Sequence, residues 1–142
     1  MKKENIKISQ KADTWQDAIG EVVGLLIQAG SCTEGYTDEI IDTVNEFGPY
    51  IVLTPGIALA HSRPSKAVLK ADMALVVYKE PVVFGHSTND PVDMVFSFCS
   101  PNSTDHIEHI TEFAEILSDE NTVQNIRKAG TIEEIYKELK MV

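Results

Sequence analysis

The stretch VDMVFSFCS, residues 92–100, decides the fold, because it is apolar at nearly every position after Asp93. A short strand with so little polar alternation is typical of the centre of a sheet that is buried on both faces. Four shorter apolar stretches predict further strands, over residues 50–53, 56–60, 71–79 and 81–85. Thr54-Pro55 joins the first two and predicts a turn. The middle of the chain is therefore expected to form a sheet.

Helical patterns of apolar residues flank these strands on both sides. Two helices are predicted before the strands, over residues 14–30 and 38–47, and three follow Pro101, ending near Leu117, covering 119–128 and starting at Thr131. The expected N-caps are Asp13 or Thr14, Thr37, Ser103 or Thr104, and Thr131. A sheet covered by helices places the chain in the α/β class. The 142 residues contain no repeat or linker, so we expect one domain over residues 1–142.

The helix after Pro101 has an apolar stripe that we expect to face the sheet: Ile107, Ile110, Phe113, Ala114 and Leu117. His106 lies in line with this stripe, in the first turn of the helix. It is therefore expected near the sheet, at the positive end of the helix dipole, where anions bind readily. His109 falls between the stripe and the exposed side.

Charge and hydropathy exclude several classes of function. Lys and Arg number 12 and Asp and Glu number 22, so the net charge is −10. This excess of carboxylates repels nucleic acid and anionic membranes, and no basic stripe compensates for it. The longest apolar runs, residues 22–27 and 73–77, are far shorter than the ~20 residues that span a bilayer. With no signal-peptide pattern at the start, we expect a cytoplasmic protein without membrane insertion.

His61 is the first candidate for chemistry, because it ends an apolar strand and precedes a loop limited by Pro64. Loops at strand ends are where α/β proteins place ligands. Ser62 supplies a hydroxyl and a backbone N–H, and Arg63 supplies a guanidinium, so the group suits an anion such as phosphate. The alternative from local chemistry is a partly buried histidine with one hydrogen bond.

The other candidate groups are weaker. His106 and His109 have a spacing that allows a shared metal, with Asp105 as a third ligand, but an ordinary helical pair is the alternative. His86 lies in a polar turn and is expected to be a loop residue. Cys32 and Cys99 show no metal or redox spacing and are expected to be buried and reduced. The chain also lacks the serine-hydrolase elbow, the phosphate-binding glycine loops and the zinc-protease motif.

GPYIVLTPGIALAHSRP, residues 48–64, closely resembles the enzyme IIA proteins of the bacterial phosphoenolpyruvate-dependent sugar phosphotransferase system. The similarity lies in the mannitol/fructose class and, within it, in the ascorbate-type branch. Residues 81–119 form a second match, with F-G, then D-P-V, an apolar strand and a helix that begins with His106. The resemblance extends over about residues 6–140. It implies a mixed sheet of about five strands with helices on both faces.

The resemblance also implies roles for particular residues. His61 matches the family's phosphorylated histidine and His106 its second active-site histidine, while Ser62 and Arg63 are expected to bind the phosphoryl group without a metal or cofactor. Two positions depart from the family pattern. Ala60 replaces the usual proline, which predicts a less rigid loop. Asn45 stands where mannitol-type members carry an arginine, and Arg63 is our candidate for the missing positive charge.

The partners follow from the same resemblance. The expected donor is the phosphorylated histidine-containing carrier protein, and the expected acceptor is a cysteine of enzyme IIB. The membrane component IIC then moves the carbohydrate, for which the branch suggests ascorbate. One alternative is a regulatory phosphoprotein, of the nitrogen or transcription-linked type, in which phosphorylation of His61 controls binding to a regulator. Another is a metal-binding or scaffold module built on His106 and His109.

Overall fold

A five-stranded mixed sheet forms the centre of the protein, and the computed structural model describes residues 1–141. The strands are β1 (Ile6–Ser9), β2 (Val52–Thr54), β3 (Ile57–Ala60), β4 (Asp72–Val82) and β5 (Val92–Cys99), in the order β1-β4-β5-β3-β2. Strand β5 is central, as its sequence predicted. It pairs parallel to β3 and antiparallel to β4, while β1 is parallel to β4 and β2 antiparallel to β3. The predicted mixed α/β architecture is confirmed.

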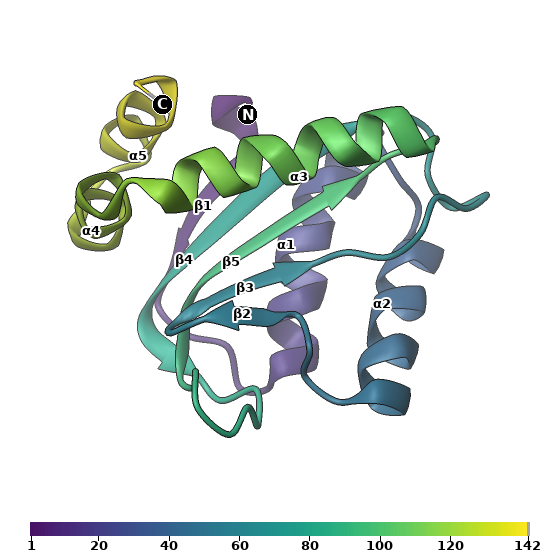
Figure 1. The fold of residues 1–142 in the computed structure, drawn as a ribbon, viewed down its shortest axis with the longest axis horizontal. Coiled ribbons are helices and arrows are strands. Elements are labelled where there is room, and N and C mark those ends of the chain that lie inside the picture. The colour runs from purple at the N-terminus through teal and green to yellow at the C-terminus, as the bar shows by residue number, and fades with distance from the viewer. Residues whose placement is uncertain (142) are drawn as a thin grey trace.

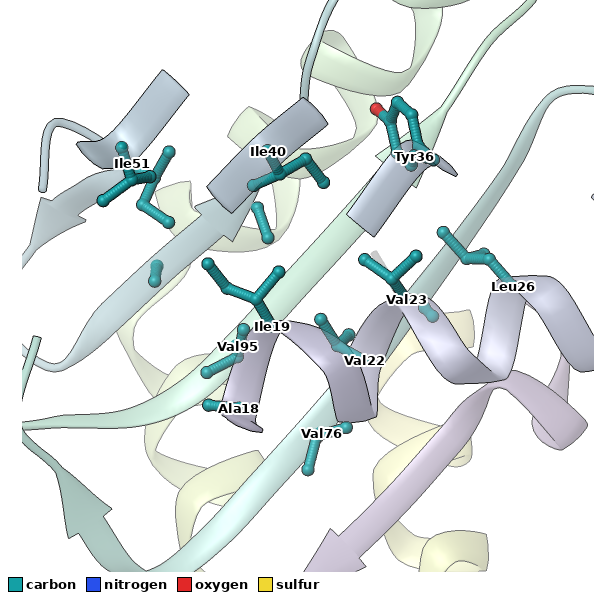
Figure 2. Packing of buried hydrophobic residues seen from close by; sticks show 14 of the residues in the cluster. Ala18, Ile19, Val22, Val23, Leu26, Tyr36, Ile40, Ile51, Val76 and Val95 are labelled. Carbon is teal, nitrogen blue, oxygen red and sulfur yellow. The ribbon is translucent and has the colours of Figure 1, made fainter. Parts of the chain in front are cut away.

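Helices α1 (Trp15–Gln28) and α2 (Glu34–Phe47) cover one face of the sheet. In Figure 1, α1 lies behind the strands and α2 lies beside them, at the right of the view. Figure 2 shows Ile19, Val22 and Val23 of α1 packed among the apolar side chains of α2 and the sheet. All three are fully buried. This apolar layer packs against one face of the sheet and supports its strands.

Helices α3 (Ser103–Ser118), α4 (Glu120–Lys128) and α5 (Ile132–Lys140) cover the opposite face. Figure 1 shows α3 crossing in front of the sheet. Thr131 caps α5 as predicted, accepting a hydrogen bond from the backbone N–H of Glu134. A short 3-10 turn at Lys3–Asn5 precedes β1. Within residues 1–141, no helix has the length and apolar character needed to cross a membrane.

Two predicted helix starts were wrong. Helix α2 begins at Glu34 after Thr33, not at residue 38 after Thr37, because Tyr36 already belongs to its buried face together with Ile40 and Val44. The N-cap of α3 is Asn102, not Ser103 or Thr104. The side chain of Asn102 accepts the backbone N–H of Asp105 at 2.9 Å.

Two strand predictions also need correction. Residues 71–79 and 81–85 do not form two strands: β4 runs continuously to Val82, and Pro81 lies where the register with β5 shifts between Val77 and Val82. A proline there removes no regular ladder hydrogen bond. The fifth strand is instead β1, which the sequence prediction missed. Only Ile6 and Ile8 mark it, and an edge strand of four residues leaves a weak pattern.

The apolar stripe predicted for α3 was partly right: Phe113 is buried and Leu117 packs against the core, but Ile107 and Ile110 do not face the core. Ile107 is 63% exposed and Ile110 41% exposed, whereas Phe113 and Ile116 are buried. The residues that turn inward at the start of the helix are His106 and His109, both against Phe98. The helix is thus rotated relative to the apolar pattern, and this rotation shapes the site described next.

Candidate active site

The site lies at the edge of the sheet where the parallel strands β3 and β5 both end. His61 directly follows Ala60, the last residue of β3. Ala60 is fully buried and its carbonyl accepts the hydroxyl of Ser97 at 2.7 Å, so strand pairing and this bond hold position 60 in place. The end of β3 is therefore tied down just before the histidine.

A hydrogen bond sets the orientation of the His61 ring. Its Nδ1 lies 2.8 Å from the carbonyl oxygen of Leu59. A carbonyl only accepts, so Nδ1 carries the proton and Nε2 carries the free lone pair. Burial lowers the pKa of His61 below its ordinary value, with a smaller contribution from His106. The ring is therefore neutral near pH 7, with Nε2 available as a nucleophile.

Phe98, near the end of β5, forms the floor of the site. Its ring stacks on His61 with the centroids 5.3 Å apart and the planes 15° apart. The ring of His106 meets the same Phe98 edge-on at 4.9 Å, and the centroids of His61 and His106 are 6.1 Å apart. The two histidines that the sequence analysis singled out are thus brought together on one aromatic surface.

His106 reaches this surface from the first turn of α3. Its Nδ1 is buried and has no hydrogen-bond partner among the described residues. A proton on Nε2 leaves only a lone pair to bury at Nδ1, so Nε2–H is the favoured donor. His106 also lines a cavity with His61. It can therefore donate a hydrogen bond to an anion held there.

The cavity beside His61 has a volume of about 650 Å³ and is open to solvent. It is lined by residues of α2, of the α2–β2 loop, of the loop after β3 and of α3: Thr43, Phe47, Tyr50, His61, Ser62, Arg63 and His106. Arg63 is exposed and is the cationic residue among them. Asn45 is exposed and does not belong to this lining, so position 45 contributes no charge to the cavity.

Ser62 lies at the cavity, but its backbone N–H is already engaged. It donates to the hydroxyl of Tyr36 at 2.9 Å. This leaves the side-chain hydroxyl as the group of Ser62 that can meet a ligand. From the sequence, both the hydroxyl and the backbone N–H of Ser62 were expected to be available to a ligand. Nothing in the local sequence indicates that Tyr36 of α2 binds this N–H.

An apolar groove of about 550 Å³ lies on the other side of His61, between α3 and the β2–β3 hairpin. Its lining includes the exposed Leu53 and Ile110. Phe47 and Tyr50 are exposed at the first cavity, and Ile107 is exposed on α3 about one turn before Ile110. Exposed apolar side chains of this size in one area mark a contact surface. Sequence reasoning missed this surface because it assigned the isoleucines to the core.

The remaining candidates fall outside the cavities. Both ring nitrogens of His109 are buried and have no hydrogen-bond partner in the described part of the chain, and Nδ1 lies 3.6 Å from Glu112. Among residues 1–141, no three His, Cys, Asp or Glu side chains are grouped to hold a metal.

His86 is a loop residue as predicted, and its Nδ1 accepts the N–H of Asn89. Cys32 and Cys99 are free and buried, and the neighbouring Cys32, together with burial, raises the pKa of Cys99.

Fold and site together define a class: an α/β protein that presents a neutral histidine, a second histidine and an arginine at a shallow, apolar-rimmed depression. The family model described as "Phosphoenolpyruvate-dependent sugar phosphotransferase system, EIIA 2" matches residues 1–142. The chain belongs to this family and is a sugar phosphotransferase component of the EIIA type.

Relatives and solved structures agree with this assignment. The chain is 36% identical over 133 residues to the ascorbate-specific EIIA component of Shigella boydii, covering 93% of this chain and 86% of that protein. The solution structure of the cryptic mannitol-specific enzyme IIA of Escherichia coli has a TM-score of 0.90 at 25% identity and covers 98% and 94% of the two chains. The Escherichia coli mannitol enzyme IIA in complex with phosphorylated enzyme IIB has a TM-score of 0.86 at 24% identity, covering 100% and 98%.

Proposed function

We propose that this protein relays a phosphoryl group through His61, from a phosphorylated histidine-containing carrier protein to a cysteine of its enzyme IIB. The observation that carries the proposal is the geometry of His61. Its Nδ1 is bound to the carbonyl of Leu59, and its ring lines a cavity that it shares with His106 and Arg63. A histidine held in one tautomer at an open cavity is suited to accept a phosphoryl group at Nε2.

The chemistry needs no proton transfer from the nucleophile. The lone pair of Nε2 attacks phosphorus in line, a new N–P bond forms, and the N–P bond of the donor's phosphohistidine breaks. The proton on Nδ1 remains on Nδ1 and donates to Leu59. The partial positive charge that develops on the ring is thereby stabilised by a fixed carbonyl dipole. In the second step a cysteine thiolate of enzyme IIB attacks phosphorus and His61 leaves as the neutral ring.

Three side chains are placed to stabilise the charge on the transferring group. We assign His106 as the principal donor, through Nε2, since its ring centroid is 6.1 Å from that of His61 and its first-turn position on α3 adds the helix dipole. Arg63 and the hydroxyl of Ser62 line the same cavity and supply further positive charge and one hydrogen bond. Phosphoryl transfer by positioning and electrostatics alone is a known strategy.

The apolar rim supports docking of protein partners rather than of a small molecule. Phe47 and Tyr50 lie exposed at the cavity, Leu53 and Ile110 lie exposed at the groove on the other side of His61, and Ile107 is exposed on α3. A shallow site ringed by exposed large hydrophobics suits a protein surface better than an enclosed ligand. The complex solved for the structurally similar mannitol enzyme IIA, with phosphorylated enzyme IIB, agrees with this role.

We further propose the cytoplasm as the place of this relay and ascorbate as the carbohydrate, which is moved and phosphorylated by a membrane IIC component. The support is the 36% identity to an ascorbate-specific EIIA component. The alternative, a regulatory phosphoprotein, has support in the similarity of the fold to other EIIA-type proteins. A IIB and a IIC gene beside the gene for this chain favour the transport role, and their absence favours the regulatory one.

The test is incubation with phosphoenolpyruvate, enzyme I and the carrier protein, followed by intact mass measurement. We expect one added phosphoryl group that is labile in acid and stable in base, as for a phosphoramidate. His61→Ala should abolish it, and His86→Ala is the matched control because His86 lies in a loop outside both cavities. A phosphoryl group retained in His61→Ala contradicts the assignment.

A further inference from the structure

Tyr36 is a fully buried residue in the first turn of α2, yet its hydroxyl reaches the candidate site. Figure 2 shows its ring among the core side chains that α2 contributes. The hydroxyl donates to the carbonyl of Phe98 at 2.7 Å and accepts the backbone N–H of Ser62 at 2.9 Å. The carbonyl of Ser62 lies farther away, at 3.3 Å. The Tyr36 hydroxyl oxygen thus links β5 to the loop that follows β3.

Both bonded backbone groups belong to residues that set the position of His61. Ser62 directly follows His61, so its amide restrains the peptide on the carboxyl side of the nucleophile. Phe98 carries the ring on which His61 stacks and against which His106 packs. The two groups come from the loop after β3 and from β5, and β3–β5 pairing ends at Ala60 and Ser97. Beyond that point the Tyr36 hydroxyl, instead of strand pairing, links the two segments through its hydrogen bonds to Ser62 and Phe98.

The hydroxyl is not needed for packing. A phenylalanine at position 36 would fill the same space without burying a polar atom, and burying a hydroxyl is unfavourable unless it is paired. Here it is paired twice, and only with backbone at the site. Burial raises the pKa of Tyr36 well above its ordinary value, so the hydroxyl keeps its proton and its donor role over the working pH range.

We propose that Tyr36 is a positioning residue for phosphoryl transfer, whose hydroxyl holds His61 and the Phe98 platform in their reactive arrangement. This inference rests on the proposed transfer at His61. Tyr36 touches neither the phosphoryl group nor a partner, because its side chain is fully buried. It acts by fixing where Nε2 of His61 stands relative to the donors of the cavity.

Tyr36→Phe tests the proposal in single-turnover transfer from the phosphorylated carrier protein. We expect the saturating rate constant to fall by about 10²-fold, the loss that a misplacement on the order of 1 Å causes. The carrier concentration at half-saturation should stay unchanged, because the docking surface is intact. The final amount of phosphorylated protein should also be unchanged, since His61 is still present.

Tyr78→Phe is the matched control. Tyr78 is also buried, and its hydroxyl bonds Glu21 of α1 at 2.6 Å instead of the loop at His61. The substitution removes the same atom and a partly buried hydrogen bond. We expect a transfer rate equal to that of the parent chain. A rate as low as that of Tyr36→Phe would mean that general destabilisation slows transfer, and would overturn the proposal.

Two NMR measurements decide the point independently of transfer. The Ser62 amide of the unmodified chain should be protected from hydrogen exchange, and Tyr36→Phe should remove this protection. The pKa of His61 should rise toward its ordinary 6.5 in Tyr36→Phe, as water reaches the loosened ring, and stay low in Tyr78→Phe.

The outcomes separate the inference from the proposed function. A freely exchanging Ser62 amide in the unmodified chain overturns the inference even if Tyr36→Phe fails to fold. A parental transfer rate and His61 titration in Tyr36→Phe overturn it as well. If the unmodified chain accepts no phosphoryl group, the proposed function fails, and the two NMR measurements alone decide whether Tyr36 positions His61.

Discussion

The two halves of α3 differ in what they bury. In the C-terminal half, Phe113 and Ile116 pack against the sheet. In the N-terminal half, Ile107 and Ile110 are exposed while His109 turns inward; its Nδ1 lies 3.6 Å from Glu112, and neither ring nitrogen has a hydrogen-bond partner among residues 1–141. Exposed isoleucines and unpaired buried nitrogens both lower stability. The half of the helix beside His61 is therefore organised for contact with an external molecule, and the other half for stability.

The largest expected difference between the halves is in stability. Phe113→Ala should lower the free energy of unfolding by about 3–5 kcal/mol, because it leaves a cavity against Phe96. Ile107→Ala should change it by less than about 0.5 kcal/mol, because the side chain is already in water. Urea denaturation of both variants measures this. Equal losses would show that the N-terminal half also belongs to the core.

The next effect concerns transfer. His106→Ala should slow single-turnover transfer by about 10²–10³-fold, the usual loss on removing one preorganised donor. His106→Gln retains an N–H and should recover part of the rate. His109→Leu is the control: it keeps an inward apolar side chain and should leave the rate near that of the parent. If His109→Leu is the slower variant, the stabilising donor is not His106.

A smaller effect is expected for docking. Ile110→Ala should raise the carrier concentration at half-saturation by about tenfold, in line with a loss of about 1.4 kcal/mol at an interface residue, without changing stability. Val83→Ala is the control, since Val83 is an apolar residue that is even more exposed than Ile110 but lines neither cavity at His61. An unchanged half-saturation in Ile110→Ala would place the docking surface elsewhere.

The smallest effect is a pH dependence of stability that comes from His61, which lies beside His106 of the N-terminal half of α3. The folded state lowers the pKa of His61, so unfolded chains bind more protons than folded ones just below pH 6.5. The contribution of neutral His61 is complete above that pH and is lost as the pH falls through the lowered pKa. His61→Gln should flatten this part of the stability profile, measured by denaturation between about pH 5 and 7. A profile that is unchanged in His61→Gln would assign the dependence to other groups.

Regular elements with strong local patterns were predictable. The apolar run of β5 identified the central strand, and Thr14 and Thr131 identified two helix starts. Weak or interrupted patterns were not. Strand β1 has only four residues at the edge of the sheet, and Pro81 divided β4 into two apparent strands although a register shift accommodates it. Predictions from the local sequence pattern fail for such segments, because pairing with a neighbouring strand makes them β-strands although their own pattern is weak.

The sequence by itself determined the α/β class, the family resemblance and the choice of His61 and His106, because these follow from local patterns and from a motif that is contiguous in the chain. Only the tertiary structure decided which side of α3 faces the sheet, and therefore that Ile110 lines the groove beside His61 and Ile107 is exposed, instead of both filling the core. It alone placed the Tyr36 hydroxyl between Ser62 and Phe98, which lie 26 and 62 positions away. Hydrogen bonds between distant segments depend on how whole elements pack, and no spacing within one segment specifies them.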